Sequence, residues 1–119
     1  MKVDYKEIFN LKVMLDKAKI PYEFLDRSFI DYKNHILNHP FYQIIVYEPN
    51  QKNIEEPIRL ISVIQGFGTY GEKEDLLEIR GCLTVRESKY DSVAGSLTAK
   101  NVFKRIKKEY QKLKENSNE

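Results

Sequence analysis

Apolar residues recur at helical spacing near both ends of the chain. The first apolar stripe runs to about Lys19 and consists of Ile8, Leu11, Met14, Leu15 and Ala18. These spacings of three and four residues predict one helix with a single apolar side. Asp4 and Glu7 have the spacing of a capping box, so we expect this helix to begin beside them. Pro21 is expected to end it, because proline lacks the backbone donor that a helix needs.

A second helix is predicted to close the chain. Thr98 is a favourable N-cap residue. The apolar side that follows it consists of Val102, Phe103, Ile106, Tyr110 and Leu113. Polar residues fill the positions between, so the helix is amphipathic.

Four stretches between the helices have the composition of β-strands: residues 22–29, 41–47, 58–65 and 75–83. Residues 41–47 are almost all aromatic or β-branched, which favours a strand. Residues 58–65 are largely apolar on both faces, so we place them in the middle of the sheet. Residues 30–40 fit either a helical turn or a loop. Residues 84–90 are expected to be a connection, and residues 91–95 are expected to be a turn or a short extended piece.

The order of these elements predicts an α+β fold with two layers. Short connections favour antiparallel pairing, and two amphipathic helices can cover one sheet face. We therefore expect a small antiparallel sheet of three to four strands, flanked by an N-terminal and a C-terminal helix. Residues 1–113 form a single domain in this prediction, and residues 114–119 form a frayed C-terminal tail.

Composition describes an ordinary globular chain rather than a disordered one. Of 119 residues, 41% are hydrophobic and 32% are charged, and the net charge is only +2. The lone cysteine, Cys82, rules out an internal disulfide framework and fits a reducing cytosol. No long apolar run follows Met1 or occurs elsewhere, so we expect a cytoplasmic protein without a membrane span.

Residues 66–71, GFGTYG, match the G-x-G-x-x-G fingerprint of dinucleotide-binding proteins. That fingerprint requires a helix directly after the loop, whereas residues 72–80 alternate and carry four acidic side chains that would repel a phosphate. A glycine-rich hairpin loop is the preferred interpretation. A recognition loop that exposes Phe67 and Tyr70 is the alternative.

Charge is distributed unevenly along the chain. Residues 98–115 contain seven Lys or Arg against two Glu, and residues 72–78 contain four acidic residues against one Lys. The predicted closing helix carries a stripe of lysines four residues apart: Lys100, Lys104, Lys108 and Lys112. Such a stripe fits either a nucleic-acid contact or an ordinary solvated helix face.

Classical reactive groups are few. His35 and His39 are four residues apart, but no third ligand lies near them and Pro40 follows, so we expect no metal site. Cys82 lies between apolar residues with no histidine close in sequence, which indicates a small core residue rather than a nucleophile. We therefore expect neither enzymatic activity nor a cofactor.

Three longer stretches resemble a group of small proteins of phages and prophages in Gram-positive bacteria. They are IPYEF (residues 20–24), SVIQGFGTYGEKEDLLEIRGCLT (residues 62–84) and YDSVAGSLTAKNVFKRI (residues 90–106). The group's pattern runs S-V-I-x-x-x-G-S-Y-G, D-L-L-E-I-x-G-L-L-T and D-S-V-x-G-x-L-T-A-x-x-V-F-x-R-I. This chain departs from it at Thr69, where Ser is usual, at Cys82, which replaces an aliphatic residue, and at Ser96, which replaces a frequent aromatic.

The resemblance implies a source in a phage or an integrated element and supplies no catalytic residues. Small phage proteins without an enzymatic signature are often counter-defence factors. We therefore expect a non-enzymatic protein that binds and inhibits a bacterial defence component, with a CRISPR effector as the preferred target. The residues expected to contact it are Phe67, Tyr70, Glu72, Glu74 and Asp75, because loop carboxylates can engage the Arg and Lys of a nuclease.

Two further functions stay open at this point. One is an oligomeric sponge that sequesters a cyclic nucleotide or ADP-ribose signal, with Arg59, Arg80 or Arg105 on its phosphates. The other is a DNA- or RNA-binding accessory protein whose affinity falls steeply with salt.

Overall fold

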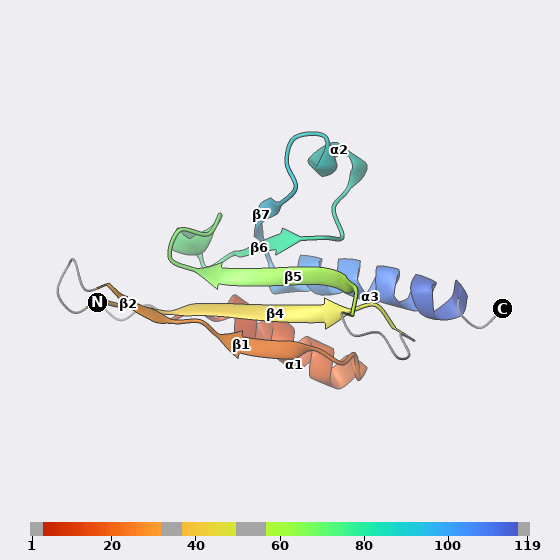
Figure 1. Ribbon diagram of the computed structural model, residues 1–119, viewed down its shortest axis with the longest axis horizontal. Coiled ribbons are helices and arrows are strands. Elements are labelled where there is room, and N and C mark those ends of the chain that lie inside the picture. Colours follow the sequence, from red (N-terminus) through yellow and green to blue (C-terminus); the bar gives the residue numbers. More distant parts are fainter. Residues whose placement is uncertain (1–3, 32–36, 50–56, 117–119) are drawn as a thin grey trace.

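A five-stranded antiparallel sheet and two long helices form the two layers of the molecule (Figure 1). The computed structural model describes residues 4–31, 37–49 and 57–116. The sheet has the strand order β1-β4-β5-β6-β7, and β2 and β3 form a separate two-stranded ribbon. In chain order the elements are α1 (Glu7–Ala18), β1 (Glu23–Asp26), β2 (Phe29–Asp31), β3 (Leu37–His39), β4 (Phe41–Tyr47), β5 (Arg59–Gly66), the 3-10 helix η2 (Glu72–Glu74), β6 (Leu77–Arg80), α2 (Val85–Ser88), β7 (Ala94–Leu97) and α3 (Ala99–Asn116).

The core lies between one sheet face and the two helices α1 and α3. Ile44 of β4 pairs with Val63 of β5, and Val63 pairs with Ile79 of β6, so these three side chains form a row across the sheet. All three are buried, as are Leu11 of α1 and Val102 of α3. The predicted two-layer α+β arrangement and the central position of β5 are confirmed.

The prediction of three to four strands was wrong, because the main sheet has five. The additional strand is β7, whose first two residues lie in the stretch 91–95 that was expected to be a turn or a short extended piece. Its four residues, Ala94 to Leu97, place a Gly and a Ser between two apolar residues and show no strict alternation. Its strand conformation comes from pairing with β6, in which Leu77 is opposite Leu97.

The predicted strand over residues 22–29 is divided between two sheets. The Asp26 carboxylate accepts a hydrogen bond from the Ser28 backbone N–H at 2.9 Å, which makes a tight turn after β1. The Ser28 hydroxyl then accepts from the Phe41 N–H at 3.1 Å. The chain consequently leaves the main sheet at this point, and β2 pairs with β3 instead.

The expected capping box at Asp4 and Glu7 was also wrong. Helix α1 begins at Glu7 after the N-cap residue Lys6, whose side chain makes no capping hydrogen bond. The cap comes from Asp75, whose carboxylate accepts from the Lys6 N–H at 3.0 Å and from the Glu7 N–H at 3.3 Å. The helix ends at Ala18, where Lys19 takes a left-handed conformation before Pro21.

Gln65 completes this cap inside the protein. Its side chain is fully buried, its amide donates to the Asp75 carboxylate at 2.6 Å, and its carbonyl oxygen accepts from the Ile8 N–H at 3.1 Å. The start of α1 is therefore fixed to β5 and to the residue just after η2 by one hydrogen-bonded group. We call Gln65 and Asp75 the α1 cap pair.

Helix α3 begins as predicted. The Thr98 hydroxyl accepts from the Asn101 N–H at 3.1 Å, and the Glu7 carboxylate accepts from the Ala99 N–H at 3.2 Å. Glu7 thereby links the first turns of α1 and α3. The helix continues to Asn116, past the predicted limit at residue 113. In the part of the chain that the structure describes, no helix has both the length and the apolar character needed to span a membrane.

Candidate functional site

The GFGTYG loop connects the antiparallel neighbours β5 and β6. Gly66 ends β5, and the Thr69 hydroxyl accepts from the Gly66 N–H at 3.1 Å and donates to the Gly66 carbonyl at 2.8 Å. Gly68 and Gly71 have φ angles of +86° and +90°, which glycine adopts readily. The loop leads to a three-residue 3-10 helix and then to β6, not to an α-helix. The predicted hairpin loop is confirmed, and the dinucleotide fingerprint lacks the helix it requires.

Acidic side chains hold this loop in place. One Glu72 oxygen accepts from the Tyr5 hydroxyl at 3.1 Å, and the other accepts from the Gly68 N–H at 3.1 Å. The Glu78 carboxylate accepts from the Tyr70 N–H at 3.0 Å. Burial and the hydrogen bond to Glu72 raise the pKa of Tyr5 above its ordinary value, so its hydroxyl keeps the proton that it donates. The loop is therefore attached to its surroundings through its own backbone amides.

The three acidic residues predicted to contact a partner have different positions. Glu72 and Asp75 are half-buried, and their carboxylates accept the hydrogen bonds described above. Glu74 is exposed. Of the three, Glu74 is thus the one whose side chain is well placed to reach a partner.

The two loop aromatics are exposed, with 57% of Phe67 and 60% of Tyr70 accessible. The Phe67 ring contacts His39, with ring centroids 4.4 Å apart, and lies 6.4 Å from Phe29. Phe29 is opposite His39 in the β2–β3 ribbon, and their ring centroids are 5.1 Å apart. We call these three rings, together with the exposed Tyr70 of the same GFGTYG loop, the aromatic surface. The sequence did not reveal that the β2–β3 ribbon contributes Phe29 and His39 to this surface. Residues 30–40, which include β3, show no clear periodicity, so their strand pairing could not be predicted.

Tyr70 is fixed against β7. The Ser96 N–H donates to the Tyr70 carbonyl at 3.3 Å. A Cβ atom on Gly95 would lie only 2.2 Å from the Tyr70 Cβ, so any side chain at position 95 would displace the tyrosine. Tyr70 is consequently held against the edge strand β7 rather than on a detached loop.

The two histidines of the chain, His35 and His39, are four residues apart in the sequence. His39 belongs to the aromatic surface, and His35 lies outside the described residues. Within residues 4–31, 37–49 and 57–116, no three His, Cys, Asp or Glu side chains come together to hold a metal ion.

Cys82 packs against the core, as expected for a small core residue. Burial raises the pKa of its thiol to about 11. The thiol is therefore neutral at physiological pH, and a neutral thiol is a weak nucleophile.

The lysine stripe on α3 is exposed along its whole length. Seven Lys or Arg against two Glu make α3 strongly cationic. Its apolar side packs on the sheet through Val102 and Ile106, so the lysines face away from the core.

Arg105, one of the residues considered for phosphate binding, is engaged within the chain. Its guanidinium makes a two-pronged ion pair with Glu87, with distances of 2.7 and 3.0 Å, and also donates to the Cys82 carbonyl at 3.2 Å. Glu87 in turn closes a capping box with Thr84 at the start of α2, a short helix in the stretch predicted to be a connection. Arg105 therefore joins α3 to α2.

Replacing Glu87 with glutamine is expected to lower the free energy of unfolding at neutral pH by about 1–2 kcal/mol, since the ion pair and the charged part of the cap are both lost. Hydrogen bonds from Arg105 and the Thr84 backbone lower the pKa of Glu87 from 4.5 to about 2. The stabilisation that the ionised Glu87 carboxylate gives to the folded protein is then complete above pH 4.5 and disappears as the pH falls toward 2. Urea unfolding of both proteins at a series of pH values tests this, and the two curves should converge at the acidic end. A constant difference down to pH 2 would contradict it.

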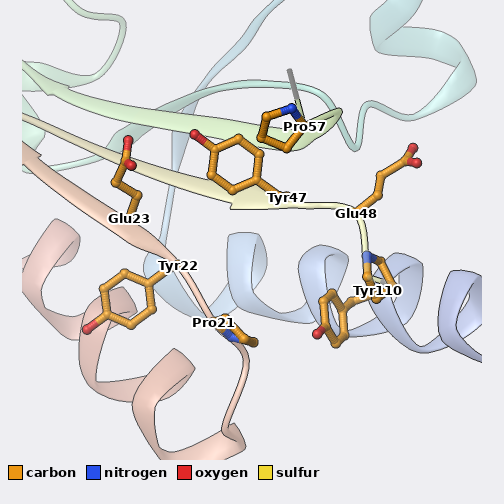
Figure 2. A pocket seen from close by; sticks show the side chains of 8 residues that line it. Pro21, Tyr22, Glu23, Tyr47, Glu48, Pro57 and Tyr110 are labelled. Atoms are coloured by element: carbon orange, nitrogen blue, oxygen red, sulfur yellow. The ribbon is translucent and has the colours of Figure 1, made fainter. Parts of the chain in front are cut away.

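Figure 2 shows a pocket of about 450 Å³. It lies at the end of the β4–β5 pair where Tyr47 is opposite Arg59, and the GFGTYG loop leaves the other end, where Phe41 is opposite Gly66. Three tyrosines from different elements line it: Tyr22 beside β1, Tyr47 at the end of β4 and Tyr110 on α3. Three prolines and the side chains of Glu23 and Glu48 complete the described lining. We call it the tyrosine pocket. Sequence patterns did not indicate this pocket, because its tyrosines are far apart along the chain.

Comparison with models of known protein families, with curated protein sequences and with solved structures finds no match to this chain. Its function must therefore be inferred from its own surfaces. The aromatic surface and the tyrosine pocket both offer aromatic side chains to a ligand.

Proposed function

We propose that this chain is a non-enzymatic protein-binding domain that inhibits a bacterial defence component, with a CRISPR effector as the preferred target. The observation that carries the proposal is the aromatic surface, in which Phe67 and Tyr70 are exposed on a loop whose backbone is held by Glu72 and Glu78. Exposed aromatic residues are the residues that most often dominate protein–protein binding energy. A loop already fixed in one conformation loses little entropy on binding.

The phage origin and the inhibitory role come from the resemblance of residues 20–106 to small phage and prophage proteins. The charge pattern supports a local contact: Glu74 is exposed in the segment that follows the GFGTYG loop and offers a carboxylate to a basic partner. With a net charge of +2, the chain as a whole does not imitate DNA.

The double substitution F67A/Y70A is expected to lower affinity for the target by roughly thirtyfold or more, the effect of losing about 2 kcal/mol of binding free energy. In bacteria with an active CRISPR system, the wild-type protein should restore the survival of a targeted plasmid, and the double variant should restore much less. Both side chains are exposed, so thermal unfolding should change little.

Tyr90→Ala is the matched control, because Tyr90 is an aromatic residue that is 84% exposed outside this surface. It should restore plasmid survival as the wild type does. Full activity of F67A/Y70A would exclude the aromatic surface as the contact. Failure of the wild type against every effector type tested would exclude the CRISPR proposal itself.

The lysine stripe favours a second candidate, a DNA- or RNA-binding accessory protein. Four exposed lysines on one helix can follow a phosphate backbone, and such binding weakens steeply with salt. Absence of binding to DNA and RNA at low salt would eliminate it. The nucleotide-sponge alternative has less support, because Arg105 is held by Glu87 and the described lining of the tyrosine pocket contains no Lys or Arg.

A further inference from the structure

We infer that a second copy of this chain pairs with strand β1, so that two sheets join into one across a two-fold axis. This inference goes beyond the proposed inhibition and does not depend on it. Figure 1 shows β1 at the margin of the main sheet, with α1 behind it. An edge strand has one row of backbone N–H and C=O groups directed away from its own sheet, and another strand can pair with that row.

The two edges of the described sheet, β1 and β7, differ in regularity. The pairing of β7 with β6 has a register shift, and Ser96 within β7 has a φ angle of +56°. Such irregularities hinder pairing with a further strand. Strand β1 pairs with β4 residue for residue from Glu23 to Asp26, without a register shift and without a positive φ angle. Of the two edges, β1 is therefore the one shaped to accept another strand.

Hydrogen bonding to β4 shows which backbone groups of β1 face outward. The Arg27 N–H, just after β1, donates to the carbonyl of the first β4 residue at 2.7 Å. Hydrogen-bonded pairs alternate along an antiparallel ladder, so Leu25 and Glu23 also bond to β4. The backbone groups of Phe24 and Asp26 consequently face away from the sheet, and a second β1 must bond through them.

Glu23, Leu25 and Arg27 lie on the sheet face opposite the helices. Phe24 packs against the core on the helix side, and strand alternation places its neighbours on the other face. The Arg27 Nε donates to the Gln43 carbonyl oxygen at 2.6 Å, which holds the arginine on this face. Glu23 and Arg27 are exposed and Leu25 is half-buried. The open face of the edge therefore carries a negative and a positive side chain on either side of a leucine.

This order of charges fits a second copy of the same strand. When Phe24 lies opposite Asp26 of an antiparallel second copy, Leu25 lies opposite its own counterpart at the two-fold axis. Glu23 then lies opposite Arg27 of the second copy, and the same pair recurs on the other side of the axis. Opposite charges that face each other across two strands are favourable, and like charges are unfavourable. Charged residues usually protect an edge strand from pairing, but these complement a second β1.

Exposed apolar side chains on α1 extend the same surface. Phe9 and Val13, about one helical turn apart, are 40% and 50% exposed. The centroid of the Phe9 ring lies 5.7 Å from that of the Phe24 ring, so this side of α1 adjoins β1. A two-fold axis perpendicular to the sheet keeps both copies of α1 on one face of the joined sheet. Association can then remove Phe9 and Val13 from water, which favours the dimer.

Sedimentation velocity tests the dimer, and the wild type at about 100 µM should give the mass of two chains. Glu23→Arg and Arg27→Glu each place like charges opposite each other, so each should weaken the dimer by roughly tenfold or more. The double variant E23R/R27E restores opposite charges, as does an equimolar mixture of the two single variants, so both should dimerise again. A monomeric wild type would overturn the inference. So would a dimer that neither single charge reversal weakens, or the failure of both restored combinations.

Cysteine cross-linking tests the register. Leu25→Cys on a Cys82→Ser background places two thiols in a pair without backbone hydrogen bonds, where Cα atoms are about 4.5 Å apart and a disulfide can form. This variant should cross-link two chains under mild oxidation. Glu23→Cys on the same background should cross-link far less, because its counterpart lies opposite residue 27 instead. Equal cross-linking of the two variants would contradict the pairing.

Val13→Arg tests the contribution of α1. An arginine there brings a charge to the surface that two copies bury, so the dimer should weaken by roughly tenfold or more. Val85→Arg is the matched control, because Val85 is 76% exposed on α2, and it should leave the dimer unchanged. Both positions are exposed, so thermal unfolding should change little. Equal weakening by the two variants would show that added charge acts in general, and the proposed interface would be wrong.

Discussion

Replacing Asp75 with alanine is expected to lower the free energy of unfolding by about 2–3 kcal/mol. The Asp75 carboxylate accepts from the backbone amides of Lys6 and Glu7 and from the buried amide of Gln65, at distances between 2.6 and 3.3 Å. Alanine would leave the first amides of α1 and the Gln65 side chain without these acceptors. An unsatisfied buried amide costs more than the net gain of an ordinary hydrogen bond. Asp75 also has a φ angle of +56°, a left-handed conformation that Asp adopts more readily than Ala.

Urea unfolding measures this effect, and two further variants show its cause. Asp75→Asn keeps an acceptor and tolerates the left-handed conformation. The free energy of unfolding of this variant should therefore lie between those of the wild type and Asp75→Ala. Glu74→Ala removes the neighbouring acid, which is exposed, and should change the free energy of unfolding by less than about 0.5 kcal/mol. Equal losses for Glu74→Ala and Asp75→Ala would show that the acidic run acts through general charge rather than through the cap.

The α1 cap illustrates what the sequence could not predict. Asp4 and Glu7 have the local spacing of a capping box, and that spacing was sufficient to suggest one. The residue that caps the helix is 69 positions from Lys6, and only the folded sheet brings it there. Periodicity did predict α1, α3 and the strand over residues 41–47, because each has a long apolar pattern whose burial the whole fold requires. Strand β7 was not predicted, because a four-residue strand containing Gly and Ser has no such apolar pattern.

The candidate site, like the fold, was predicted only in part from the sequence. The exposure of Phe67 and Tyr70 followed from their place between glycines in a hairpin loop. The contact of Phe67 with Phe29 and His39 did not, because it depends on the strand pairing of a separate ribbon. The acidic run was interpreted as a contact surface, whereas Glu72 and Asp75 hydrogen-bond within the chain. Local sequence indicates which residues are polar, but not which of them find partners inside the fold.

Replacing Gly81 with alanine is expected to destabilise the protein by about 3 kcal/mol or more, combining a backbone penalty with overpacking. Gly81 follows β6 and has a φ angle of +102°. A Cβ atom there would lie 2.4 Å from the Leu60 carbonyl oxygen and 3.1 Å from the Ile61 Cα. Both atoms belong to the backbone of β5, the central strand, which cannot move aside without disturbing its pairs with β4 and β6.

Gly68→Ala separates the two contributions to this loss. Gly68 also has a positive φ angle, +86°, but a Cβ atom added there has no neighbour within 4 Å. Gly68→Ala should therefore cost only the conformational part, about 1–2 kcal/mol. The difference between the two variants in urea unfolding measures the steric part, which belongs to the contact between Gly81 and β5. Equal losses would mean that β5 yields to the added methyl group, and that Gly81 is required for its backbone angle alone.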